Sequence, residues 1–168
     1  MKLLLTLSIT SLICLGNVLV PRLSLANESA NSEFKPALIQ SLECRRINRN
    51  YVTIATTNRN SVTTATHFII WRTTEFSASG YTPQRRCREV TSKLKEIIAR
   101  NGGSLNGVLL TTGRANRYRT LRHVDNSSAY DSDHFLFHIS GKNSQNPDQL
   151  IAKLLSFNVV GSTLPIVE

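Results

Sequence analysis

The sequence is poor in cysteine, with only Cys14, Cys44 and Cys87 among its 168 residues. No two of them have the Cys-x-x-Cys spacing of a thioredoxin-type redox pair or of a zinc site. The Gly-x-Ser-x-Gly motif of the α/β-hydrolases is also absent, and Gly102-Gly103 is followed by no phosphate-loop lysine. These absences leave no motif for catalysis. We therefore interpret the protein as non-enzymatic and without a cofactor.

The first 26 residues have the pattern of a secretory signal peptide. Lys2 gives a positive start, an apolar run follows over residues 3–20, and Ser24 and Ala26 are the small residues that a signal peptidase reads. The apolar run is at the short end for a membrane span, and a polar segment follows it. We expect cleavage after Ala26 and export, with membrane anchoring as the alternative.

Acidic residues are the minority charge, at 11 against 20 lysines and arginines, which gives a formal net charge of +9. Removal of Lys2 and Arg22 with the signal peptide leaves 18 basic and 11 acidic residues, so the net charge becomes +7. A positive exported protein is attracted to an anionic membrane, to envelope polymers or to an acidic protein. Nucleic acid is the usual partner of a basic domain, but export disfavours it here.

Cys44 and Cys87 remain after cleavage, and two cysteines in an exported chain most simply form one disulfide. The loop that it closes has about 44 residues, for which the chain-entropy estimate of the stabilisation is roughly 4 kcal/mol. A redox pair or a metal-binding pair is the alternative, although the spacing disfavours both.

Segments rich in β-branched residues predict the strands of the fold. We expect a flexible polar segment over residues 27–40, followed by a single domain over residues 41–168. The predicted strands are residues 41–46, 51–57, 61–72, 108–112, 118–124 and 134–140. The first three strands are expected to form an antiparallel meander.

Two segments predict helices. In the first, Thr82 suits the N-cap and Pro83 the first helical position. Cys87 lies on an apolar stripe of this helix and is expected to face inward, toward the strand that carries Cys44. The other members of the stripe are Val90, Leu94, Ile97 and Ile98. The motif Asn101-Gly102-Gly103 ends this helix, and the second helix begins at Pro147, with its apolar face formed by Leu150, Ile151, Leu154 and Leu155.

The order of these segments is three strands, a helix, three strands and a helix. This order predicts an α+β fold with a mainly antiparallel sheet of about six strands and two helices packed on one face. Residues 161–168 are expected to be a loop.

Three arginines lie at the start of the first helix, namely Arg85, Arg86 and Arg88. Cations there oppose the helix dipole at a cost of roughly 0.3–1 kcal/mol each, so their presence needs a reason. One reason is an anion, because free backbone N–H groups and arginine side chains suit a carboxylate, sulfate or phosphate. The other, which we favour, is an internal partner such as Glu43 or Glu89. We expect Arg86 to serve the fold through Glu43, and Arg85 and Arg88 to face solvent.

Histidines and aspartates near residues 123–138 are of the types that bind metals or act in hydrolysis. A strand over residues 134–140 places His134 and His138 roughly 13 Å apart, so they cannot share one ion. The loop over residues 125–133 lacks the glycine and the final glutamate of an EF-hand, so solvated side chains are favoured over a weak calcium site. The alternative function is a secreted hydrolase that uses His123, Asp125, Asp131 and Asp133.

Several motifs resemble the circadian oscillating protein family of cyanobacteria. The residues that carry the resemblance are Glu43-Cys44-Arg45, Ile69-Ile70-Trp71, Phe76, Gly80-Tyr81-Thr82-Pro83-Gln84, Arg86-Cys87, Val90, Leu110-Thr111-Thr112-Gly113 and Asn116. The resemblance spans roughly residues 43–168 and implies a small exported domain, often associated with a membrane. It implies no catalytic residues. The second cysteine pair that is usual in the family is missing from the fifth and sixth predicted strands.

These observations together predict a non-enzymatic, exported binding or structural factor. We expect it in the periplasm, the thylakoid lumen or outside the cell, associated peripherally with an anionic membrane or envelope surface. Its candidate anion-binding residues are Arg85, Arg86 and Arg88.

Overall fold

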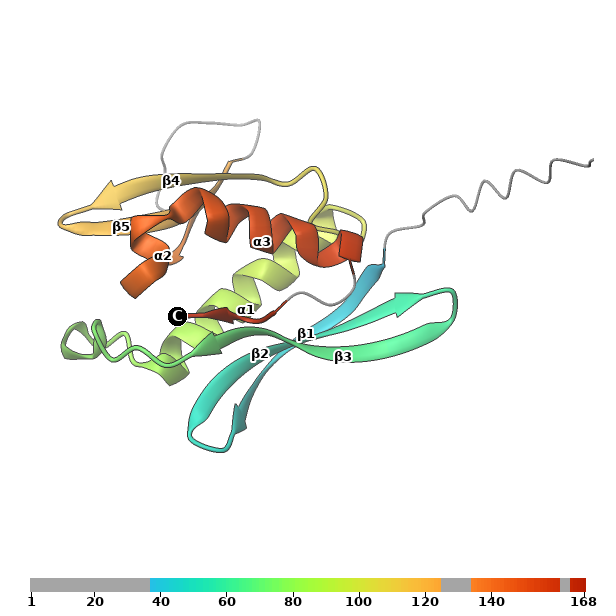
Figure 1. Ribbon diagram of the computed structural model, residues 1–168, viewed down its shortest axis with the longest axis horizontal. Helices are drawn as coiled ribbons and strands as arrows, with labels where there is room; N and C mark the ends of the chain where they lie inside the picture. The colour runs from blue at the N-terminus through green and yellow to red at the C-terminus, as the bar shows by residue number, and fades with distance from the viewer. Residues whose placement is uncertain (1–36, 125–133, 161–163) are drawn as a thin grey trace, which may run out of the picture. The chain divides into compact units, whose positions relative to one another are not determined.

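The computed structural model describes residues 37–124, 134–160 and 164–168 (Figure 1). Its first described elements are three antiparallel strands that form a meander. The strands are β1 (Leu38–Ile47), β2 (Asn50–Arg59) and β3 (Val62–Trp71). Asn48 and Asn60 occupy the turns between them with φ values of 54° and 50°, a conformation that asparagine tolerates better than most residues. The predicted meander is therefore confirmed, although β1 begins earlier than Ser41.

The helix α1 (Pro83–Arg100) begins and ends where the sequence indicates. The Thr82 side chain accepts a hydrogen bond from the Arg85 backbone N–H, and Pro83 occupies the first turn. Gly103, with φ of 85°, follows the helix in the left-handed conformation, and its N–H bonds to the Ile98 carbonyl. The apolar stripe from Cys87 to Ile98 is buried against β1, β2 and β3, and α1 also contacts β6.

The remaining long strands form a second sheet, and this corrects the expectation of one six-stranded sheet. This sheet has the order β4 (Leu109–Ala115), β5 (Tyr118–Val124) and β6 (Phe135–His138), all antiparallel. Short turns in the sequence predict which consecutive strands pair as hairpins. They do not predict whether β4 pairs with β3 in the same sheet. Here α1 lies against both sheets, and the free edge of β3 is occupied by another strand.

That strand is β7 (Ile166–Val167), which pairs parallel with Ile69 and Ile70 of β3. The sequence analysis assigned this segment to a loop, because a two-residue strand has no periodicity to detect. Between β6 and β7 lie a short helix, α2 (Gly141–Gln145), which was not predicted, and α3 (Pro147–Val160), which begins at Pro147 as predicted. The fold is α+β as expected, but the described residues form two sheets and three α-helices.

The disulfide predicted between Cys44 and Cys87 is present and joins β1 to α1. Cys87 is fully buried within a core to which both sheets and the helices α1 and α3 contribute. The largest fully buried apolar side chains are Trp71, Phe68, Phe157, Leu42, Ile69, Leu94, Leu105, Leu121, Ile139, Leu150 and Leu154.

Several expectations concern residues outside those that the structure describes. They are the signal peptide over residues 1–26, residues 27–36 of the polar segment, and Asp125, Asp131 and Asp133. Within the described residues, no helix combines the length and hydrophobicity needed to span a membrane.

Removal of the disulfide should destabilise the fold. Cys44 and Cys87 are 43 positions apart in the sequence, and a loop of that length predicts a loss of roughly 4 kcal/mol in the free energy of unfolding for Cys44→Ala/Cys87→Ala. Urea denaturation measures the loss. Intact mass before and after reduction is the independent check, and two alkylatable thiols in the unreduced, denatured protein would contradict the disulfide.

Candidate functional site

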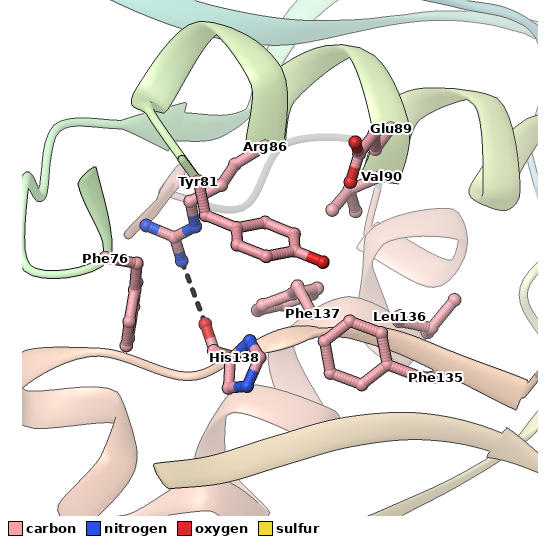
Figure 2. Close-up of a pocket in the computed structure, with 9 residues that line it drawn as sticks. All are labelled: Phe76, Tyr81, Arg86, Glu89, Val90, Phe135, Leu136, Phe137 and His138. Carbon is pink, nitrogen blue, oxygen red and sulfur yellow. Dashed lines mark hydrogen bonds between the residues drawn. The ribbon is translucent and has the colours of Figure 1, made fainter. Parts of the chain in front are cut away.

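Arg86 is the most deeply buried charged residue at the start of α1, with a side chain only 2% exposed. Its Nη2 atom donates to the main-chain oxygen of His138 at 2.9 Å and to Oε2 of Glu168 at 3.2 Å. Figure 2 shows the guanidinium directed at the His138 carbonyl, with the Phe76 ring beside it. Burial lowers the pKa of Arg86, and the Glu168 carboxylate opposes that effect. The expectation that Glu43 is the partner of Arg86 is wrong, because Glu43 forms an exposed pair with Arg45.

Glu168 supplies the carboxylate of this buried pair. Besides Arg86, its Oε2 atom accepts hydrogen bonds from the backbone N–H and the hydroxyl of Ser140, at 2.9 and 2.8 Å. Its Oε1 atom accepts from the Asn143 side chain at 2.7 Å. The backbone of Glu168 bonds to Ile70, Arg72 and Thr73 beside β3. One residue therefore connects α1, β3, α2 and the segment after β6.

Aromatic rings surround the Arg86 guanidinium and the neighbouring His138. The guanidinium carbon lies 4.9 Å from the ring centroids of both Trp71 and Phe76, which is the range of a cation–π contact. His138 lies among four further ring contacts, with Phe76, Tyr81, Tyr118 and Phe135, at 4.9 to 5.9 Å. Burial, together with the positive charge of Arg86, lowers the pKa of His138.

The pocket beside these rings is too small for a substrate. Its space is about 10 Å³, enough for about one water molecule. It is lined by Phe76, Tyr81, Arg86, Glu89, Val90, Phe135, Leu136, Phe137 and His138 (Figure 2). The arrangement therefore indicates a structural role for Arg86 and its ring neighbours.

The three arginines proposed as an anion site do not act as one group. Arg85 is exposed and pairs with Glu89, one of the partners that the sequence analysis weighed, and the hydrogen bond and charge of Glu89 raise the pKa of Arg85. Arg88 is exposed, as expected. Arg86 points inward, so the helix start presents only two of these side chains to solvent.

A larger basic surface, which the sequence analysis missed, lies at the β4–β5 hairpin. We call it the hairpin hollow, an open depression of about 570 Å³. Its lining residues are Glu75, Arg114, Arg117, Tyr118, Arg119, Ile139 and Ser144. In the strand register, Arg114 is directly opposite Arg119, so two like charges face each other across the hairpin. The sequence holds one signal of this surface. Arg114 and Arg119 lie at equal distances on either side of the two-residue turn Asn116-Arg117, and this spacing brings them together at the end of a hairpin.

The glycine of the Leu110-Thr111-Thr112-Gly113 motif has a packing role in this hairpin. A Cβ atom at Gly113 would lie 3.2 Å from Nε of Arg122 and 3.3 Å from the Thr120 hydroxyl, which is closer than side chains normally approach. A hydrogen at this position therefore lets the Arg122 side chain lie across β4.

Of the four residues of the alternative hydrolase site, His123 alone lies within the described part of the chain. The rings of His123 and His134 stack with centroids 6.3 Å apart, but Asp125, Asp131 and Asp133 lie outside the described residues. Within the described part of the chain, no group of three or more His, Cys, Asp or Glu side chains is arranged to hold a metal ion.

Comparison with known protein families identifies a relationship for most of the chain. The family model described as circadian oscillating protein COP23 matches residues 41–168. No curated protein and no solved structure matches the chain.

Loss of the buried Arg86 charge should be far more costly than loss of an exposed one. We expect Arg86→Gln to lower the free energy of unfolding by about 3–5 kcal/mol, the usual effect of removing one partner of a buried ion pair. Arg85→Gln, which breaks only an exposed pair, should have a much smaller effect. Urea denaturation compares the two variants. Equal effects would mean that the Arg86–Glu168 pair does not support the fold.

The depressed pKa of His138 should make stability depend on pH. Because the unfolded chain then binds the proton more readily than the folded one, the free energy of unfolding should fall as the pH drops below about 6.5. His138→Phe should remove this part of the slope, whereas His67→Gln, an exposed position on β3, should keep it. Urea denaturation at several pH values from about 7.5 to 5 measures the slope. An unchanged slope in His138→Phe would contradict the assignment.

Proposed function

The chain belongs to the circadian oscillating protein COP23 family, and from this premise we propose that it is a non-enzymatic, exported binding or structural factor. We propose further that it associates peripherally with an anionic membrane or envelope surface. The observation that carries the proposal is the set of arginines around the hairpin hollow, which have no acidic partner in the described part of the chain.

The charge of the protein is available at the surface. Among the described acidic side chains, Glu43 and Glu89 are paired with Arg45 and Arg85, and Glu168 is buried. The other three, Glu75, Glu96 and Asp148, are exposed and are outnumbered by the exposed basic side chains. Arg114 and Arg117 are exposed on the β4–β5 hairpin and form no ion pair with the described residues. Further exposed basic side chains outside the hairpin are Arg46, Arg49, Arg72, Arg88, Lys95, Arg100, Lys142 and Lys153. Such an excess of one sign attracts anionic partners before any specific contact forms.

Two features support export. Residues 1–26 have the pattern of a signal peptide, and a disulfide is typical of proteins outside the reducing cytoplasm. An anionic lipid surface adds roughly 1 kcal/mol of attraction for each lysine or arginine close to it. Several exposed arginines therefore suffice for peripheral binding without an apolar anchor.

A salt wash of host membranes tests this proposal. Binding through exposed charges is screened when the Debye length falls from about 30 Å in 10 mM salt to about 3 Å in 1 M salt. We expect the protein in the membrane fraction at low salt and in the supernatant after the high-salt wash, as detected by immunoblotting. Retention until detergent is added would indicate an anchored protein, and absence from the membrane fraction at low salt would overturn the proposal for membranes.

A further inference from the structure

We propose that the hairpin hollow binds the dianionic phosphate group of a phosphomonoester. The inference deepens the proposed function. The phosphate comes either from a lipid headgroup or from a soluble phosphate ester, and only the choice between these two sources rests on the proposed function. The observations that carry it are the net charge of the hollow, the opposed arginines across the hairpin and the way in which Tyr118 is held.

The net charge of the hollow matches a dianion. Three arginines and one glutamate line it, which gives 3 − 1 = +2. A phosphomonoester carries about −1.5 to −2 charges near neutral pH, because its second pKa is about 6. A carboxylate or a phosphodiester carries only one negative charge, so the hollow favours the monoester over both.

Arg114 and Arg119 repel each other across the hairpin, and a bound anion would remove this unfavourable interaction. Directly opposed like charges destabilise an antiparallel pair of strands. Glu75, the acidic residue of the hollow, is exposed and pairs with neither arginine. A phosphate oxygen can accept charge-assisted hydrogen bonds from two guanidinium groups at once, and it therefore turns this repulsion into a favourable interaction.

The walls of the hollow are held before any ligand arrives. The Arg117 guanidinium lies 5.0 Å from the Tyr118 ring centroid, and that ring packs edge-on against Phe76 at 5.0 Å and His138 at 5.7 Å. The Arg119 carbonyl accepts a hydrogen bond from the Ile139 N–H at 2.9 Å, which fixes β5 to the end of β6. A site that is already ordered loses less entropy when it binds.

The β1–β2 hairpin provides a matched control within the same chain. Its two-residue turn is Asn48-Arg49, which corresponds to Asn116-Arg117 in the β4–β5 hairpin, and both asparagines have φ of 54°. Arg46 occupies the position equivalent to Arg114, but Tyr51 stands opposite it where the other hairpin has Arg119. Arg46 and Arg49 are exposed, so their removal changes the net charge without touching the hollow.

The experiment compares Arg114→Gln/Arg119→Gln with Arg46→Gln/Arg49→Gln, both made in the full chain and purified from the host as the exported protein. Calorimetric titration with glycerol 3-phosphate measures the soluble monoester, and dimethyl phosphate serves as the monoanionic diester. Each lost arginine contact should weaken binding roughly tenfold, so we expect roughly a hundredfold loss in the hollow variant, which removes two of them. The control variant should change by less than about twofold, because its charges are exposed and screened.

A second arm identifies the source of the phosphate. Vesicles of phosphatidylcholine with phosphatidic acid present the monoester, and vesicles with phosphatidylglycerol at equal surface charge present the diester. A preference for phosphatidic acid that is lost only in the hollow variant supports a lipid headgroup. Binding of glycerol 3-phosphate without that preference supports a soluble ester, and this result stands even if the salt wash finds no membrane association.

Two results would overturn the inference. One is equal weakening of binding in the two double variants, which would mean that only the total charge matters. The other is the absence of monoester binding in both arms. Thermal melting provides the folding control, since the hollow variant relieves a like-charge contact and should melt at a temperature no lower than that of the unmodified protein in low salt.

Discussion

The buried ion pair between Arg86 and Glu168 is the interaction on which the arrangement of the other elements depends. Taking two charges out of water is costly, and the pair is stable only because other donors satisfy the carboxylate. Those donors come from Ser140 and Asn143, so the pair orders the segment after β6 and the short helix α2. The Trp71 and Phe76 rings flank the guanidinium carbon. Position 86 therefore requires the charged, hydrogen-bonding guanidinium of arginine, although the surrounding interior is largely apolar.

The basic hollow is built upon this interior. Phe76 contacts both the Arg86 guanidinium and the Tyr118 ring, and Tyr118 in turn supports Arg117 at the turn of the hairpin. Ser144 of α2 forms another part of the wall, and α2 is held by the bond between Asn143 and Glu168. The buried pair of Arg86 and Glu168 thus acts indirectly on the surface, because it helps to fix the hairpin and the helix α2 that line the hairpin hollow.

Local signals in the sequence were sufficient for α1, for the disulfide and for all six predicted strands, whose ends agree with the structure to within three residues. An N-cap followed by proline and an apolar stripe act over short distances, so they can be read directly. The two-sheet arrangement, β7 and the partner of Arg86 were missed, because each depends on residues far apart in the sequence. Arg86 and Glu168 are 82 positions apart, and no periodicity connects them. The opposition of Arg114 and Arg119 was also hidden, because the predicted strand ends at Thr112 and leaves Arg114 outside it, whereas β4 continues to Ala115.

The position of the arginines on the strands has one more consequence. In the described part of the chain, β1 and β4 each pair with only one neighbour, so each leaves a row of backbone groups that another copy of the protein is able to join. Arg46 lies on one of these edges and Arg114 on the other, and such charges keep identical edges apart by repulsion. These arginines, of which Arg114 lines the hairpin hollow, thus protect the strand edges from self-association. A surface that neutralises them also removes this protection, so crowding on an anionic support favours edge-to-edge assembly of the chain.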